Sequence, residues 1–222
     1  ALQSSGVFMS RSDLPSDDSS ERGEANLSSL VPLGISDVSA SAGDHIAHFY
    51  RGRAERFSVL GPYVQSGLER GDRCIFISGP HVADQLRTWL EDQGQDVETA
   101  LASDQLILDR GRASKEAMLR LATRAERSAS ASKTGLIRWA GDGSWNLASD
   151  MSVAEMLHWE ALYDRHAGSW DMLTLCQFDR SMFSGDVLMS ALRSHPYCIM
   201  GNVVVPNPDY VDPEVLLDEL DE

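Results

Sequence analysis

Short runs of apolar and β-branched residues alternate along this chain with longer amphipathic stretches, and this alternation limits what the chain can fold into. The alternation is typical of a β-sheet covered by helices. Because the central runs are almost continuously apolar, both faces of the sheet are expected to be covered. The sequence therefore predicts a three-layer α/β fold with a mainly parallel sheet. The predicted strands are 73–78, 105–109, 135–139, 172–178 and 198–205, and the predicted helices span about 53–69, 81–93, 114–130, 149–167 and 182–193.

Composition divides the 222 residues into three segments. Residues 1–44 are acidic and rich in serine, so they are expected to be largely flexible, except that 27–38 carries apolar residues able to dock on the domain. Residues 45–206 are expected to form the folded domain. Residues 207–222 hold seven acidic residues and no basic one. This acidic C-terminal tail is expected to be either a short amphipathic helix for a partner or a solvated end.

Charge and composition exclude several classes of function. The formal net charge is −15, from 19 basic and 34 acidic residues, which argues against direct nucleic-acid binding because phosphate contacts need a basic surface. No apolar run approaches the roughly 20 residues of a membrane span, and no signal-peptide pattern opens the chain. A cytoplasmic protein without membrane contact is expected. The three cysteines are far apart and lie in apolar stretches, as reduced structural thiols do.

The loop after the first predicted strand is where an α/β sheet of this kind would hold a phosphate-binding motif. The loop reads Ser78-Gly79-Pro80-His81, with a single glycine, a proline that removes one amide, and no lysine. ATP binding of the Walker type is therefore not expected, and no cofactor is predicted. The segment can be a plain strand-to-helix turn or can contact a ligand.

Two histidines three residues apart, His45 and His48, are followed by Phe49 and Tyr50. On a helix, both imidazoles would reach one metal ion, but this segment is expected to run extended or turned, where they need not converge. Packing of His48 or Tyr50 at the domain edge is one alternative. Contact of His45, Phe49 or Tyr50 with a ligand is the other.

A second candidate follows the third predicted strand. Trp139, Asp142 and Trp145 lie among glycines there, a composition typical of a pocket mouth, although plain packing explains it equally well. Glu160 lies in the middle of an otherwise apolar helix, where an unpaired carboxylate is costly to bury. Either its helix face is solvated or Glu160 has a partner or ligand.

The fourth predicted strand ends with Cys176 and Asp179, near the same sheet edge. Cys176, His195 and Asp179 can be combined into a catalytic set, but a thiol inside an apolar strand has a raised pKa and is inert. His195 is interpreted as a polar residue that ends a helix.

Several short motifs follow one another along the chain: His45-Ile46-Ala47-His48-Phe49-Tyr50, Leu60-Gly61-Pro62-Tyr63, Gly67-Leu68-Glu69-Arg70-Gly71-Asp72-Arg73-Cys74, Arg138-Trp139-Ala140-Gly141-Asp142, Trp159-Glu160, Leu175-Cys176-Gln177-Phe178-Asp179, His195-Pro196 and Gly201-Asn202. In this order they resemble the MEDS domain, the methanogen/methylotroph sensory domain named for a dichloromethane-responsive repressor, and the resemblance covers residues 44–210. It implies a RecA-like or KaiC-like domain that has lost the ATP-binding loop and senses small organic compounds. Relatives carry this domain beside DNA-binding or histidine-kinase modules, which this sequence does not show.

We therefore expect a non-catalytic sensor that binds a small organic ligand and passes its state to a regulatory protein such as a kinase, an anti-sigma factor or a transcription factor. A homo-oligomer is compatible with the fold, and no metal or catalytic residue is predicted. One alternative is a protein-interaction regulator on a degenerate nucleotide-binding fold with no ligand. Another is a residual enzyme, either an ATPase or a metal hydrolase. The predicted ligand-binding residues are His45, Phe49, Tyr50, Trp139, Asp142, Trp145, Glu160, Cys176 and Asp179.

Overall fold

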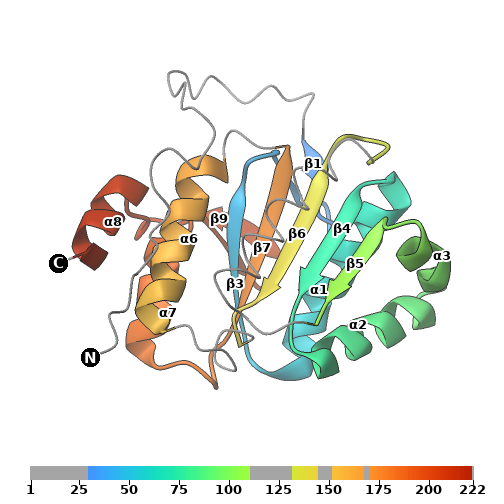
Figure 1. Ribbon diagram of the computed structural model, residues 1–222, viewed down its shortest axis with the longest axis horizontal. Helices are drawn as coiled ribbons and strands as arrows, with labels where there is room; N and C mark the ends of the chain where they lie inside the picture. Colours follow the sequence, from blue (N-terminus) through green and yellow to red (C-terminus); the bar gives the residue numbers. More distant parts are fainter. Residues whose placement is uncertain (1–29, 111–131, 145–151, 168–170, 222) are drawn as a thin grey trace, which may run out of the picture.

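The computed structural model describes residues 30–110, 132–144, 152–167 and 171–221 (Figure 1). Their centre is a seven-stranded sheet with the order β5-β4-β6-β7-β3-β8-β9, parallel except for the antiparallel edge strand β9. The α/β class with a mainly parallel sheet is confirmed. The strands are β3 (His45–Tyr50), β4 (Arg73–Ile77), β5 (Leu106–Asp109), β6 (Ile137–Asp142), β7 (Met172–Asp179), β8 (Tyr197–Met200) and β9 (Val203–Pro206).

The sheet differs from the sequence prediction in two places. The segment His45–Tyr50, for which no strand was assigned, is a strand in the interior of the sheet, paired with β7 and β8. The predicted strand 198–205 is two antiparallel strands, and Gly201 between them has a φ of 60°, a backbone conformation that favours glycine. The predicted strand number was therefore wrong.

Helices cover both faces of this sheet (Figure 1). The predicted helices 53–69, 81–93, 149–167 and 182–193 are confirmed with shifted ends, and the predicted helix 114–130 lies outside the described residues. Helix α2 begins at Pro80, so the turn reading of the Ser78–His81 loop is confirmed. The helices are α1 (Gly52–Arg70), α2 (Pro80–Asp92), α3 (Val97–Ala102), α6 (Val153–Ala167), α7 (Gly185–Arg193) and α8 (Pro213–Asp221).

Strand alternation separates two cores. Even-numbered residues of β3 and β6 and odd-numbered residues of β7, such as Ile46, Ala140 and Leu175, pack with the apolar faces of α1, α2 and α3. Alternate residues of β7 point the other way, so Cys176 and Phe178 pack with α6 and α7. Each side chain on β3, β6 and β7 is therefore assigned to the α1 face or the α6 face of the sheet.

A buried ion pair lies within the α1-face core. Arg138 on β6 donates from Nε to Asp72 Oδ2 across 2.8 Å, and both side chains are fully buried. Its other nitrogens donate to the carbonyl oxygens of Tyr63 at 3.1 Å and Pro32 at 2.7 Å. One guanidinium therefore links β6, α1 and the segment before β3.

Both terminal segments contribute packed structure. In the N-terminal segment expected to be largely flexible, β1 (Val31–Pro32) pairs with β2 (Ser39–Ala40), and Leu33 between them is fully buried, as expected for the apolar stretch 27–38. In the predicted acidic tail, α8 packs against α6 through Leu216 and Leu217, so that helix docks on its own domain.

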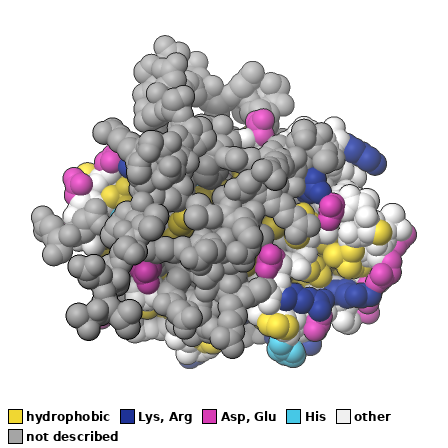
Figure 2. Space-filling model, viewed as in Figure 1, with side chains coloured by type: hydrophobic (Ala, Val, Ile, Leu, Met, Phe, Trp, Pro, Cys, Tyr) yellow, Lys and Arg dark blue, Asp and Glu magenta, His cyan; other side chains and the backbone are white. Residues whose placement is uncertain are grey.

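The surface over α2 and α3 mixes charges of both signs. Figure 2 shows Lys and Arg side chains beside Asp and Glu side chains on that side of the molecule, and Arg87 forms ion pairs with Glu91 and Glu98 there. On the described part of this face, the basic side chains do not form a separate patch. Within the described ranges, no helix combines the length and the apolar character that crossing a bilayer requires.

Candidate functional site

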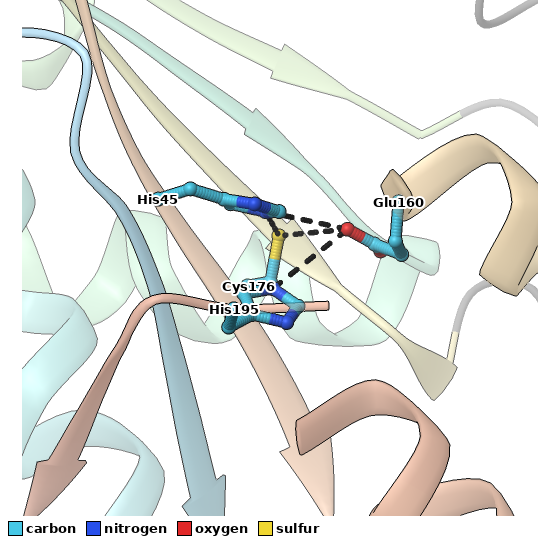
Figure 3. A group of neighbouring side chains, drawn as sticks. All are labelled: His45, Glu160, Cys176 and His195. Carbon is cyan, nitrogen blue, oxygen red and sulfur yellow. Dashed lines mark hydrogen bonds and ion pairs between the residues drawn. The ribbon is translucent and has the colours of Figure 1, made fainter. Parts of the chain in front are cut away.

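Four side chains with metal- or proton-binding atoms meet beneath α6, and we name them the histidine cluster: His45, Glu160, Cys176 and His195 (Figure 3). Their ligand atoms all lie within 4.8 Å of one another. Nε2 of His45 is 3.3 Å from both Cys176 Sγ and Glu160 Oε2. Glu160 Oε2 is also 3.6 Å from the sulfur and 3.8 Å from Nε2 of His195. The four residues come from β3, α6, β7 and the turn between α7 and β8.

Local structure explains why these side chains converge. His45 pairs in register with Thr174, so His45 and Cys176 both point to the α6 face. On α6, Glu160 and Asp164 are four residues apart and share the helix face of the buried Met156 and Leu157. Because α6 carries these two carboxylates on its apolar face, both of them lie against the sheet.

A second layer of acceptors orients both imidazoles. Nδ1 of His195 lies 2.7 Å from the carbonyl oxygen of Ala191, which can only accept, so Nδ1 carries the proton. Nδ1 of His45 lies 3.4 Å from Asp164 Oδ1, and Asp164 Oδ2 accepts a 2.6 Å hydrogen bond from Tyr210. In both rings the Nε2 atom faces the cluster interior.

Burial and mutual charge determine protonation in the cluster. Burial opposes a charge on His45, but the Cys176 sulfur and hydrogen bonds to Asp164, Cys176 and Glu160 outweigh it and raise the pKa of His45 well above its usual value. Burial lowers the pKa of His195 to about 4, aided by the charge of His45. Burial acts against ionisation of Glu160, but the two histidines overcome it and lower the pKa of Glu160.

Cys176 is not activated as a nucleophile in this arrangement. Burial, followed by the charge of Glu160, raises the pKa of its thiol to about 12, and the thiolate is the reactive form. The hypothetical set of Cys176, His195 and Asp179 does not assemble either, because Asp179 is on the opposite face of β7 and accepts hydrogen bonds from Ser181.

A second polar group lies on the α1 face at the carboxyl ends of the strands, and we name it the carboxyl-edge cluster: Tyr50, Arg56, Asp142 and Gln177. The Arg56 guanidinium is 4.5 Å from the centroid of the Tyr50 ring and 3.5 Å from Asp142 Oδ1. Asp142 pairs in register with Gln177 on the neighbouring strand. All four side chains are buried.

Each member of the carboxyl-edge cluster keeps one buried polar atom without a hydrogen-bond partner among the described residues. The atoms are Tyr50 Oη, Arg56 Nε, Asp142 Oδ2 and Gln177 Oε1. Burial raises the pKa of Asp142, although Arg56 and Ser144 oppose the shift. The neighbouring His48 accepts from Gln177 Nε2 at 3.0 Å, and burial lowers its pKa to about 4. Unpaired buried polar atoms are rare in native proteins, so four of them together make the carboxyl-edge cluster a candidate functional site.

The structure divides the predicted ligand residues between two places. Three of them, His45, Glu160 and Cys176, belong to the histidine cluster. Tyr50 and Asp142 belong to the carboxyl-edge cluster on the opposite face, so the nine predicted residues do not form one site.

Of the other predicted residues that the structure describes, Phe49 and Trp139 lie at neither centre, and Asp179 pairs in register with Tyr50 beside the carboxyl-edge cluster. Phe49 stacks on Phe178 with centroids 5.5 Å apart, which is a packing contact. Trp139 is buried on the α6 face, and Asp179 is bound to Ser181. Trp145 lies outside the described residues.

Sequence reasoning missed three members of the two clusters. His195 was interpreted as a polar helix end, and only the fold brings it beside Glu160, 35 positions earlier in the chain. Arg56 belonged to no motif, and Gln177 was part of the motif Leu175–Asp179 but was not among the predicted ligand residues. The paired-histidine hypothesis was wrong because His45 and His48 are three positions apart on a strand and therefore point to opposite faces.

Comparison with known proteins connects both clusters to one family. The methanogen/methylotroph DcmR sensory domain, MEDS, matches residues 44–196, a range that includes every member of the two clusters. The chain is 31% identical over 154 residues to the transcriptional repressor DcmR of Methylorubrum extorquens (strain DSM 6343 / CIP 106787 / DM4). That alignment covers 68% of this chain and 58% of the repressor, so the chain matches less than two thirds of its relative. The resemblance inferred from the motifs is confirmed, and a sensory or regulatory role is supported: the chain belongs to the MEDS family of sensory domains.

Proposed function

We propose that this chain is a non-catalytic sensory domain that binds a small polar organic molecule at the carboxyl-edge cluster and passes its bound state to a regulatory protein. One observation carries the proposal: four buried side chains converge there, each with a polar atom that lacks a partner among the described residues. Leaving such an atom unpaired costs about 1–3 kcal/mol. A ligand that forms hydrogen bonds with several of these atoms at once removes this cost, and the free energy recovered contributes to its affinity.

The chemistry of these atoms defines the ligand class. Asp142 Oδ2 and Gln177 Oε1 are acceptors, Arg56 Nε is a donor, and the Tyr50 hydroxyl can do either. A small molecule with a hydroxyl or amino group next to an acceptor satisfies this set, and the Tyr50 ring supplies an apolar wall. The position also agrees with the general rule that open α/β sheets bind ligands outside the carboxyl ends of their strands.

The output surface is proposed near α7 and the β8–β9 edge. Met189 on α7 and Met200 and Val203 on the hairpin are exposed large apolar side chains. Exposed apolar groups near a sheet edge are suited to protein contacts. The same observation favours the second candidate, a regulator that binds a protein partner without any small ligand.

Thermal unfolding with a panel of small alcohols, amines, aldehydes and carboxylates separates the two candidates. A ligand at 100 times its dissociation constant stabilises the fold by about 2.7 kcal/mol and raises the melting temperature by about 5–10 °C. The shift should disappear in Asp142→Asn and Tyr50→Phe and persist in Asp84→Asn, an exposed aspartate on α2. Recovery of the compound unchanged after incubation supports the non-catalytic role. A shift that survives in both cluster variants would contradict the assigned site.

A further inference from the structure

We propose that the histidine cluster binds one divalent zinc-type ion through four protein atoms: Nε2 of His45, Oε2 of Glu160, Sγ of Cys176 and Nε2 of His195. This site lies on the opposite face of the sheet from the carboxyl-edge cluster, and it does not depend on the sensory function proposed above.

The four ligand atoms have spacings close to those of a tetrahedral zinc site. Zinc bonds of about 2.0–2.1 Å to nitrogen and oxygen and about 2.3 Å to sulfur place tetrahedral ligands about 3.3–3.6 Å apart. Glu160 Oε2 lies 3.3 Å from His45 Nε2, 3.6 Å from the Cys176 sulfur and 3.8 Å from His195 Nε2. All pairs of ligand atoms lie within 4.8 Å of each other, so a side-chain shift of about 1 Å brings even the most widely separated pair to the tetrahedral spacing.

Both histidines turn Nε2 toward the cluster, and His195 already presents a free lone pair there. The Ala191 carbonyl holds the proton on Nδ1 of His195, which leaves the lone pair on Nε2. This Nε2 atom is fully buried, faces the cluster and has no hydrogen-bond partner in the described part of the chain. On the Nδ1 side of His45, the Asp164 carboxylate lies 3.4 Å away, which is an ion-pair contact longer than the hydrogen bond that holds His195. A carboxylate or a carbonyl behind each imidazole is the usual outer shell of a zinc-binding histidine.

The charge and the chemical softness of the four ligands also favour a divalent ion of the zinc type. A thiolate and a carboxylate together balance a divalent ion, so the filled site is neutral in a buried environment. Binding forms the metal–sulfur bond and the metal–nitrogen bond to His45, and it releases the Cys176 thiol proton and the Nε2 proton of the His45 imidazolium to the solvent. Nitrogen and sulfur ligands disfavour calcium and magnesium, which take oxygen, and a mixed set of two imidazoles, a thiolate and a carboxylate suits zinc.

Four protein ligands leave no open position, so the proposed ion is structural. It would join β3, β7, α6 and the α7–β8 turn at one point. Because Glu160 is the ligand from α6, the ion fixes that helix to the sheet. The position of α6 then depends on metal occupancy as well as on the apolar contacts of Met156 and Leu157.

The test uses the full chain, purified, stripped with a chelator and titrated with Zn²⁺ or Co²⁺ as the probe. We expect one equivalent of either metal, a rise in melting temperature on loading, and a Co²⁺ spectrum with the visible bands of tetrahedral coordination and a sulfur-to-cobalt charge-transfer band. Cys176→Ser should lose the charge-transfer band, and His195→Gln should lose stoichiometric binding. Cys74→Ala, which removes a buried thiol on the α1 face, should keep both.

Two outcomes would overturn the proposal without relying on any variant. The first is stripped wild-type protein that is folded by circular dichroism and takes up no stoichiometric Zn²⁺. The second is an octahedral Co²⁺ spectrum without a sulfur band. Neither result concerns ligand binding at the carboxyl-edge cluster. Failure of the proposed metal site can therefore be distinguished from failure of the proposed ligand site.

Discussion

Nδ1 of His45 lies 3.4 Å from Asp164 Oδ1, and this contact turns Nε2 of His45 toward Cys176 and Glu160. Asp164 does not reach the cluster interior, so it acts as a positioning residue. Asp164→Asn should weaken Zn²⁺ binding about 10–100-fold while leaving the stoichiometry at one. Competition with a chromophoric chelator measures the change, and Asp218→Asn on the exposed face of α8 is the control. Equal affinities in the two variants would remove Asp164 from the site.

The buried His48 makes the fold sensitive to acid. Burial lowers its pKa from 6.5 to about 4, with Arg180 and Arg56 adding to the shift and Glu55 opposing it. The unfolded chain therefore binds the extra proton first, and stability is lost as the pH falls from 6.5 to about 4.

His48→Asn keeps an acceptor for Gln177 and removes the titration. Between pH 7 and pH 4, the free energy of unfolding should fall less in this variant than in wild type, by up to about 3 kcal/mol. Urea unfolding at a series of pH values measures this, with His81→Asn on exposed α2 as the control. Parallel pH curves for wild type and His48→Asn would show that His48 is not the group responsible.

Arg138 should be among the most sensitive positions of the α1-face core. Arg138→Met removes the fully buried cation of Asp72 and leaves this carboxylate with the partly exposed Arg70, 3.3 Å away, as its cationic partner, which should cost about 3–5 kcal/mol. Arg87→Met breaks the exposed pair with Glu91 and should cost less than about 1 kcal/mol. Chemical denaturation of both variants provides the comparison, and similar losses would mean that the buried pair does not stabilise the fold more than a surface pair.

Helix α8 is predicted to stabilise the domain through its apolar face. Leu216 is 3% exposed and packs against α6, whereas Val215 on the same helix is 50% exposed. Leu216→Ala should cost about 2–5 kcal/mol, and Val215→Ala should stay within about 0.5 kcal/mol. Thermal unfolding of the two variants tests this. A Leu216→Ala protein as stable as wild type would show that the α8 contact does not stabilise the domain and would favour the interpretation of residues 207–222 as a solvated end.

Hydrophobic periodicity predicted most of the helices and strands, because secondary structure depends on which residues are close together in the sequence. The spacing of Phe57, Leu60, Val64 and Leu68 on one helix face predicted α1. The hairpin of β8 and β9 was missed although the Gly201-Asn202 pair inside the apolar run is a turn signal. The interior strand at His45–Tyr50 was missed because its two histidines interrupt the apolar pattern.

The clusters were only partly predictable because they depend on contacts between distant segments. Strand alternation alone separates His45 from His48 and pairs His45 with Cys176 once the register is known. No local pattern reveals that α6 turns Glu160 toward the turn that holds His195. In the carboxyl-edge cluster, Arg56 is recognisable only after α1 packs beside Tyr50.

The two clusters should bind different species, an organic molecule and a metal ion, on opposite faces of one sheet, and native mass spectrometry compared with the denatured mass detects both. Two separable mass excesses are expected in the protein as purified: an organic molecule that is lost in Asp142→Asn and kept in His195→Gln, and a metal ion that is kept in Asp142→Asn and lost in His195→Gln. A bare wild-type chain, or a single excess lost in both variants, would contradict this expectation.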